Sequence, residues 1–101
     1  MKSEEEAARD AIAETNYCYV LKRVFEYGEK DSVCLERIFV KSEKIEEIRL
    51  SFWRKQKFVP RPGTVDVRGW GKLLTKAIDA GVFSEEERTE MLAILSKKKN
   101  R

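Results

Sequence analysis

The chain of 101 residues contains no histidine, only two cysteines and no catalytic signature motif. Without histidine, the commonest general base and metal ligand is missing. Cys18 and Cys34 are too far apart for a known zinc-site spacing. No phosphate-binding loop of the Walker type and no nucleophile elbow is present. We therefore expect a protein that is not an enzyme and that uses no metal, no cofactor and no small-molecule substrate.

The sequence also has no long run of apolar residues. No segment approaches the roughly 20 apolar residues that a membrane span needs. The N-terminus is acidic and has no apolar core of a signal peptide. Two half-buried thiols in a reducing compartment explain Cys18 and Cys34 without a disulfide. These features predict a cytoplasmic protein without a membrane anchor.

Charge is distributed unevenly, although the net charge is only +3. Residues 1–14 carry a net charge of −3, because acidic side chains outnumber basic ones. Residues 49–76 contain eight lysines and arginines against Asp66 alone. The last five residues add four more positive charges. This asymmetry indicates an acidic element and a basic, anion-binding face.

The periodicity of apolar residues predicts an α+β fold in one small domain. Alternating segments separated by short polar turns predict a four-stranded antiparallel meander, followed by a helix that covers one face of the sheet. A further short helix is expected at each end of the chain. The predicted strands are residues 17–27, 32–41, 45–54 and 57–59. The predicted parts of the domain are an acidic N-terminal helix over 1–15, the sheet over 17–67, the main helix over 68–80, a C-terminal helix over 85–97 and a basic tail over 98–101.

Local signals set the ends of the predicted helices. Ser3 with Glu6 and Ser84 with Glu87 both have the spacing of a capping box. Gly81 fits a left-handed stop at the end of the main helix, and Asp66 is a plausible cap at its start. The apolar stripe of that helix is Trp70, Leu73, Leu74, Ala77 and Ile78.

Residues 48–63 combine positive charge with aromatic rings. The stretch has five positive side chains, no acidic one and three large aromatic residues. Cations hold phosphates and aromatic faces stack bases, which is what a groove for single-stranded nucleic acid requires. We expect Lys22 and Arg23 on the first strand to extend the path. The contact residues that we expect are Arg49, Trp53, Arg54, Lys55, Lys57 and Arg61.

Alternation along the third predicted strand divides this stretch between two faces. Arg49 and Trp53 are expected to face outward, whereas Ile48, Leu50 and Phe52 are expected in the core. Three other interpretations remain open. The charges can form an ordinary solvated strand face, the face can recognise an acidic protein partner, or the chain can be a structural subunit of a larger assembly.

The stretch from Ile48 to Ile78 resembles the single-stranded-DNA-binding domain of the positive cofactor four family of transcriptional coactivators, which has bacterial and phage relatives. The shared pattern is a strand ending in an aromatic residue and Trp, a basic turn, a Pro-Arg-Gly loop, an alternating apolar segment, and a helix with an early Trp followed by leucines. The corresponding residues are Ile48, Arg49, Trp53, Pro60, Arg61, Gly63, Val65, Val67, Trp70, Leu73 and Ile78.

The resemblance implies a curved four-stranded sheet followed by a helix, paired as a homodimer. It also implies that single-stranded DNA lies across the sheets through basic and aromatic side chains. Together with the charged and aromatic residues, it leads us to expect binding of single-stranded DNA or RNA that is largely independent of sequence. The protein would then be an accessory factor of transcription or replication. Pro62 and the helices at both ends depart from the family pattern.

Overall fold

The structure is a computed structural model that describes residues 2–27, 31–60 and 67–97. Within these ranges the chain has an α+β fold with a curled antiparallel sheet whose strands follow the order β1-β2-β3-β4-β5. The elements are α1 (Glu4–Asp10), β1 (Ala13–Glu14), β2 (Cys18–Tyr27), β3 (Asp31–Val40), β4 (Ile45–Arg54), β5 (Lys57–Val59), α2 (Val67–Asp79) and α3 (Glu85–Leu95). The predicted meander is thus present, with one strand more than expected.

The additional strand, β1, replaces the second half of the predicted N-terminal helix. The Ser3–Glu6 capping box forms as expected, but α1 ends at Asp10 and the next residue is already extended. Ile12 donates its backbone N–H to the carbonyl of Val20 at 2.8 Å. Only Ala7 of α1 is buried, so the thin apolar stripe stabilises a longer helix only weakly. Pairing of the following residues with β2 is therefore preferred over continuation of the helix. The prediction of a helix over 1–15 was wrong beyond residue 10.

A shift in register interrupts the alternation of β2. Val20 pairs with Ile38, but Lys22 pairs with Arg37, so that one residue of β2 is extra, as in a β-bulge. Side chains before and after the bulge therefore exchange faces. Strict alternation would place Arg23 on the face of Tyr19, whereas the structure places it on the opposite face.

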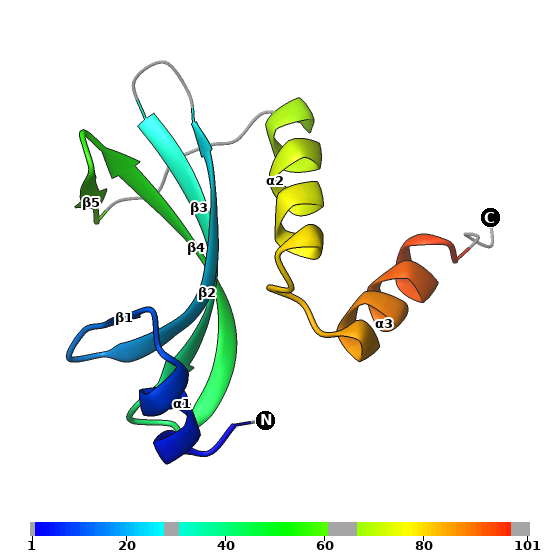
Figure 1. Cartoon of the computed structure of the whole chain (residues 1–101). Coiled ribbons are helices and arrows are strands. Elements are labelled where there is room, and N and C mark those ends of the chain that lie inside the picture. Colours follow the sequence, from blue (N-terminus) through cyan, green and yellow to red (C-terminus); the bar gives the residue numbers. More distant parts are fainter. Residues whose placement is uncertain (1, 28–30, 61–66, 98–101) are drawn as a thin grey trace.

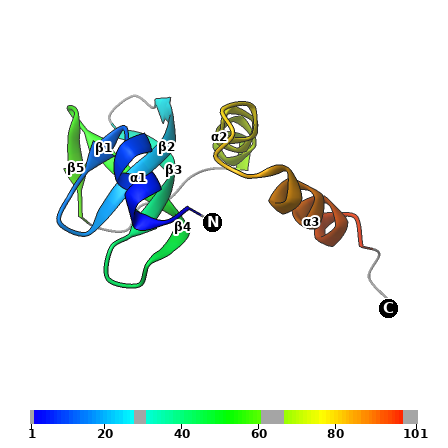
Figure 2. The ribbon, with the colours of Figure 1, turned by 60° about the horizontal axis from the view of Figure 1, so that its bottom comes forward.

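The two faces of the sheet are covered differently. The helix face packs against α2 through the buried residues Leu35, Leu73, Ala77 and Val82, with Leu50 beside them. α1 packs through Ala7 against Leu21 and Phe39. The other face, here called the inner face, lies away from α2, and both edge strands, β1 and β5, are on this side (Figures 1 and 2). One buried apolar cluster on this face consists of Cys18, Val20, Ile38 and Val40.

The β4 prediction is correct for Leu50 and wrong for Ile48. Leu50 packs against the core under α2. Ile48 lies at the surface with 38% of its area exposed, because α2 contacts mainly β2 and β3 and Ile48 does not belong to the cluster that packs under it. Phe52 is half-buried.

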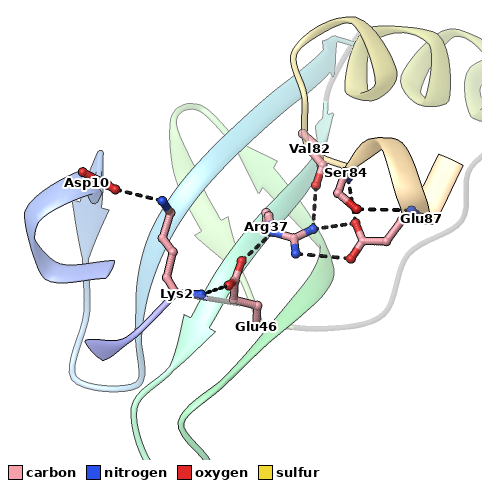
Figure 3. A network of polar contacts seen from close by, with 7 residues as sticks. All are labelled: Lys2, Asp10, Arg37, Glu46, Val82, Ser84 and Glu87. Carbon is pink, nitrogen blue, oxygen red and sulfur yellow. Dashed lines mark hydrogen bonds and ion pairs between the residues drawn. The ribbon is translucent and has the colours of Figure 1, made fainter. Parts of the chain in front are cut away.

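Helix α3 projects from the body of the molecule and has no buried residue (Figures 1 and 2). Its predicted Ser84–Glu87 capping box is confirmed. Arg37 of β3 attaches its first turn, with Nη1 2.7 Å from Oε1 of Glu87 and 3.1 Å from the carbonyl of Val82 (Figure 3). The same guanidinium binds Glu46 through Nε at 2.7 Å.

The remaining boundaries differ little from the predictions. α2 begins at Val67, which had been assigned to the sheet, and Gly81 has a positive φ of 75° just beyond its end. α3 ends two residues before the predicted position. The predicted cap Asp66 and the tail over 98–101 lie outside the described residues.

Cys18 and Cys34 are free thiols, and both are buried.

Candidate nucleic-acid interface

A buried carboxylate forms the floor of the inner face at its centre. Glu36 of β3 is fully buried, and the strand register places Arg23 of β2 and Arg49 of β4 directly opposite it on either side. Oε2 of Glu36 accepts bonds from Arg23 Nη2 at 2.6 Å and Nε at 3.0 Å. Oε1 accepts bonds from Arg49 Nε at 3.0 Å and Ser51 Oγ at 3.1 Å. Four donors therefore compensate the cost of burying this charge.

This cluster has a net positive charge, because two guanidinium groups share one carboxylate. The side chains of Arg23 and Arg49 remain 24% and 29% exposed, whereas Glu36 is not exposed at all. Solvent therefore contacts the cations and not the anion. Two arginines are thus held side by side in fixed positions with their charge directed to the surface.

Four aromatic rings form a continuous row next to these arginines. The ring centroids of Phe58 and Trp53 are 6.0 Å apart, those of Trp53 and Phe25 are 5.8 Å apart, and those of Phe25 and Tyr27 are 5.7 Å apart. The first two pairs meet edge to face, and the last is stacked. The row crosses the sheet from β5 to β2.

The polar cluster also fixes the orientation of the row. The guanidinium of Arg23 lies 5.5 Å from the ring centroid of Trp53 and 5.9 Å from that of Phe25. The indole Nε1–H of Trp53 donates to Ser51 Oγ at 2.9 Å, and Ser51 in turn donates to Glu36. The central ring is therefore connected to the buried carboxylate through one hydroxyl group.

The ends of the row are open to solvent. Tyr27 is 71% exposed and Phe58 is 50% exposed, whereas Phe25 and Trp53 are half-buried. A pocket of about 390 Å³ lies beside Phe58, lined also by Arg49, Ser51 and Pro60 among others. Exposed rings next to fixed cations are unusual for a purely structural cluster and offer stacking surfaces to a ligand. The arginine–aromatic site, as it is called below, consists of Arg23, Phe25, Tyr27, Glu36, Arg49, Ser51, Trp53 and Phe58.

The structure brings together two of the six residues predicted from sequence. Arg49 and Trp53 both belong to the arginine–aromatic site, as alternation predicted. Arg54 and Lys57 pair with each other across β4 and β5, one position away from the pair formed by Trp53 and Phe58. Neighbouring pairs in a sheet point to opposite faces, so these two cations do not join the site.

Other charged residues near the site have different roles. Arg54 forms an ion pair with Asp31, with Nε 2.7 Å from Oδ1. Lys55 occupies the exposed turn between β4 and β5 at a positive φ of 51°. Arg61 lies outside the described residues. Lys22, expected to extend the path, instead donates from Nζ to the carbonyl of Ala80 at 3.4 Å on the helix face.

Sequence reasoning missed Glu36, Phe25 and Tyr27 as members of the site. Glu36 was identifiable as a lone acid inside a segment rich in apolar residues, SVCLERIFV. Such an acid, if its strand is buried, needs cationic partners on the neighbouring strands. Regular alternation would place Phe25 and Tyr27 on the face of Tyr19, and the bulge in β2 that moves them to the opposite face has no sequence signal such as a glycine.

Cys34 lies on the inner face, and burial together with the nearby Glu36 carboxylate raises the pKa of its thiol to about 12. The group is therefore a neutral thiol and a poor nucleophile at neutral pH. Within residues 2–27, 31–60 and 67–97, no three histidine, cysteine or acidic side chains are grouped so that they could hold a metal ion.

No helix in the described part of the chain has the length and apolar character needed to cross a membrane. Comparison with known proteins finds no match: no family model, no curated protein and no solved structure matches the chain. The resemblance to the positive cofactor four family stays a prediction that rests on the residues quoted above.

Proposed function

We propose that this protein binds single-stranded nucleic acid, with DNA as the expected ligand, at the arginine–aromatic site. The observation that carries the proposal is the pair of arginines held by one buried carboxylate beside a row of four rings. Arg23 and Arg49 would bind phosphates, and the exposed faces of Phe58, Trp53 and Tyr27 would stack bases. Stacking contributes roughly 1–3 kcal/mol per base.

The composition of the site favours unpaired bases and little sequence preference. A ring stacks only on a base whose face is free, and every base has such a face. Apart from the indole and phenol groups, the rings carry no hydrogen-bonding atoms that could distinguish one base from another. This is the chemistry of an accessory factor that covers single strands during transcription or replication.

Fluorescence anisotropy with a labelled oligothymidylate tests the proposal. We expect binding at low salt that weakens as salt is added. If two phosphates are neutralised, log affinity should fall with log salt with a slope of about −1.4 or steeper. Trp53→Ala should weaken binding about tenfold or more, as loss of one stacked base requires. Trp70→Ala on α2 is the matched control and should bind as the parent protein does. Absence of binding at low salt would refute the proposal.

The alternative, a basic face for an acidic protein partner, uses the same cations without the rings. It predicts that Trp53→Ala leaves the interaction intact and that a polyglutamate peptide binds as well as the oligonucleotide does. Stacking predicts the opposite in both experiments. The row of rings next to the arginines favours nucleic acid over the acidic partner.

We also propose that two copies of the chain associate through the apolar side of α2 and α3. Leu92 and Leu95 of α3 are largely exposed, and they line a groove of about 340 Å³ against Leu74 and Ile78 of α2. Glu85 and Arg88 line the same groove. A two-fold interface brings the same patch of both copies together, so each acid can face the base of the partner. A second copy is therefore the occupant that this groove fits.

A further inference from the structure

A second basic surface lies on α2, outside the arginine–aromatic site. Arg68, Lys72 and Lys76 follow each other at intervals of four residues, which places them in line along one side of the helix. They line a groove of about 580 Å³ together with Glu26, Gly71 and Thr75. None of the cations in this stripe was among the predicted contact residues.

The charge of this groove is positive after its internal ion pair is counted. Lys76 Nζ binds Glu26 Oε2 at 2.8 Å, and this pair is neutral. Neither Arg68 nor Lys72 has an ion pair or hydrogen bond through its side chain to another described residue. Two exposed cations therefore remain for an anion of the ligand.

The floor of the groove between these cations is bare. Gly71 is exposed in the first half of α2, and a Cβ atom built there would meet no atom within 4 Å. Packing therefore does not require glycine, although glycine destabilises a helix interior relative to alanine. A missing side chain at this position lets the backbone of a ligand approach the helix closely.

The arginine–aromatic site and this groove meet at an open edge of the sheet. β1 pairs only with Val20 and Tyr19, so that among the described residues no strand pairs with the later part of β2 on that side. α2 lies next to this part of the strand (Figure 1). Lys76 connects the two, since its Nζ donates to the carbonyl of Phe25 at 3.0 Å and lies 6.0 Å from the ring centroid of Tyr27.

We infer that a nucleic-acid strand bound at the arginine–aromatic site continues past Tyr27, over the open edge of β2, and places its phosphates on Arg68 and Lys72 of α2. The inference rests on the proposed function and adds a second part of the binding surface. Bases stack on the rings of the inner face, and beyond Tyr27 the groove holds the backbone alone. The nucleic-acid strand thus passes from one side of the molecule to the other around an edge of β2 at which none of the described β-strands pairs.

Oligonucleotides of two lengths test the inference. An oligomer of about four nucleotides covers the arginine–aromatic site alone, and one of about twelve reaches the groove. We expect Arg68→Ala combined with Lys72→Ala to weaken binding of the longer oligomer about five- to tenfold at low salt and to reduce its salt slope by about 1.4. Binding of the shorter oligomer should not change. Gly71→Gln, which fills the floor without changing charge, should also weaken only the longer oligomer.

The control removes two charges elsewhere. Lys44→Gln combined with Lys97→Ala removes the same two positive charges from the turn before β4 and from the end of α3, and circular dichroism checks that every variant is folded. Equal losses in the α2 pair and this control pair would overturn the inference, as would unchanged binding of the longer oligomer in the α2 pair. If the parent protein binds neither oligomer, the proposed function itself fails. If Trp53→Ala leaves both oligomers bound while the α2 pair weakens the longer one, the groove is a binding surface and the aromatic row is not.

Discussion

At the scale of single residues, Glu36 determines both the stability and the geometry of the candidate site. It holds Arg23 and Arg49 on opposite sides and orients Trp53 through Ser51. Among the described residues, no other acid is fully buried. Removal of one partner of a buried ion pair leaves the remaining charges without compensation.

Replacement of Glu36 by glutamine should therefore destabilise the fold markedly. We expect the free energy of unfolding to fall by about 3 kcal/mol, because two partly buried guanidinium groups then face each other without an anion. Urea denaturation followed by circular dichroism measures the change. Glu43→Gln in the exposed turn before β4 is the control and should change stability by less than about 0.5 kcal/mol. Similar losses in both variants would contradict this role of Glu36.

The turn between β4 and β5 has a local strain that one substitution should relieve. Lys55 and Gln56 both have positive φ, at 51° and 65°, a conformation that two-residue hairpins require and that glycine adopts without cost. We expect Gln56→Gly to raise the free energy of unfolding by about 0.5–1 kcal/mol. Thermal and urea denaturation of the parent and the variant test this. A variant of lower stability would show that the turn does not have this conformation.

Single residues also show where sequence reasoning succeeds and fails. Arg49 and Trp53 were placed correctly because β4 is regular and alternation needs no other information. Regular alternation would keep Phe25 and Tyr27 on the face of Tyr19, but one extra residue in β2 reverses the alternation. The position of a bulge depends on how β2 pairs with β3, which the sequence of β2 alone does not contain.

At the scale of elements, the attachment of α3 depends on one ion pair. Arg37 binds Glu87 with both terminal nitrogens, and Glu87 also accepts the backbone N–H of Ser84 (Figure 3). These bonds, first that to Arg37, lower the pKa of Glu87 to about 2. The carboxylate is thus more stable in the folded chain than in the unfolded chain.

The position of α3 should therefore depend on pH in the acidic range. A lowered pKa means that the stabilisation is fully present above the ordinary pKa of 4.5 and is lost as the pH falls through about 2. A titration of the Glu87 side-chain resonance by NMR should give a midpoint near 2. In Arg37→Gln the midpoint should move toward the ordinary value. A midpoint near 4.5 in the parent protein would show that the pair does not form in solution.

The elements themselves differ in how far the sequence determines them. α2, β3 and β4 have clear periodicity and were predicted within one residue or so at most ends. β1 was missed because a strand of two residues is too short to show an alternation of apolar and polar side chains. Its pairing with β2 satisfies backbone hydrogen-bonding groups and does not depend on burial of a row of apolar side chains. The end of α1 is set by that pairing and not by a local stop signal.

At the scale of the whole molecule, the fold exposes apolar surface that a single copy does not cover. We expect sedimentation equilibrium to give the mass of a dimer at micromolar concentration. Leu92→Glu, in the groove between α2 and α3, should shift the equilibrium to monomers, because it places a charge in the interface. Ile94→Glu is the matched control: Ile94 is also exposed on α3 but does not line that groove. A parent protein that is monomeric, or equal behaviour of both variants, would contradict the proposed interface.

The charge asymmetry seen in the sequence acquires a location in the fold. The segment that sequence reasoning treated as one basic surface is divided between the two faces of the sheet and α2. Alternation in β4 separates Arg49 from Arg54, and the helical repeat of α2 gathers Arg68 and Lys72 beside the edge of β2. The uneven distribution of charge along the sequence predicted a basic, anion-binding face, but only the arrangement of elements separates cations that join the rings from those that do not.

The central claim, that bases stack on Trp53, is tested most directly by the fluorescence of a protein in which Trp53 is the single tryptophan. Trp70→Phe produces such a protein and leaves the arginine–aromatic site unchanged. Addition of oligothymidylate at low salt should quench the emission with a saturable dependence on concentration, and added salt should reverse it. Emission that stays constant while the oligonucleotide binds, or no binding at all, would contradict the assignment of this site.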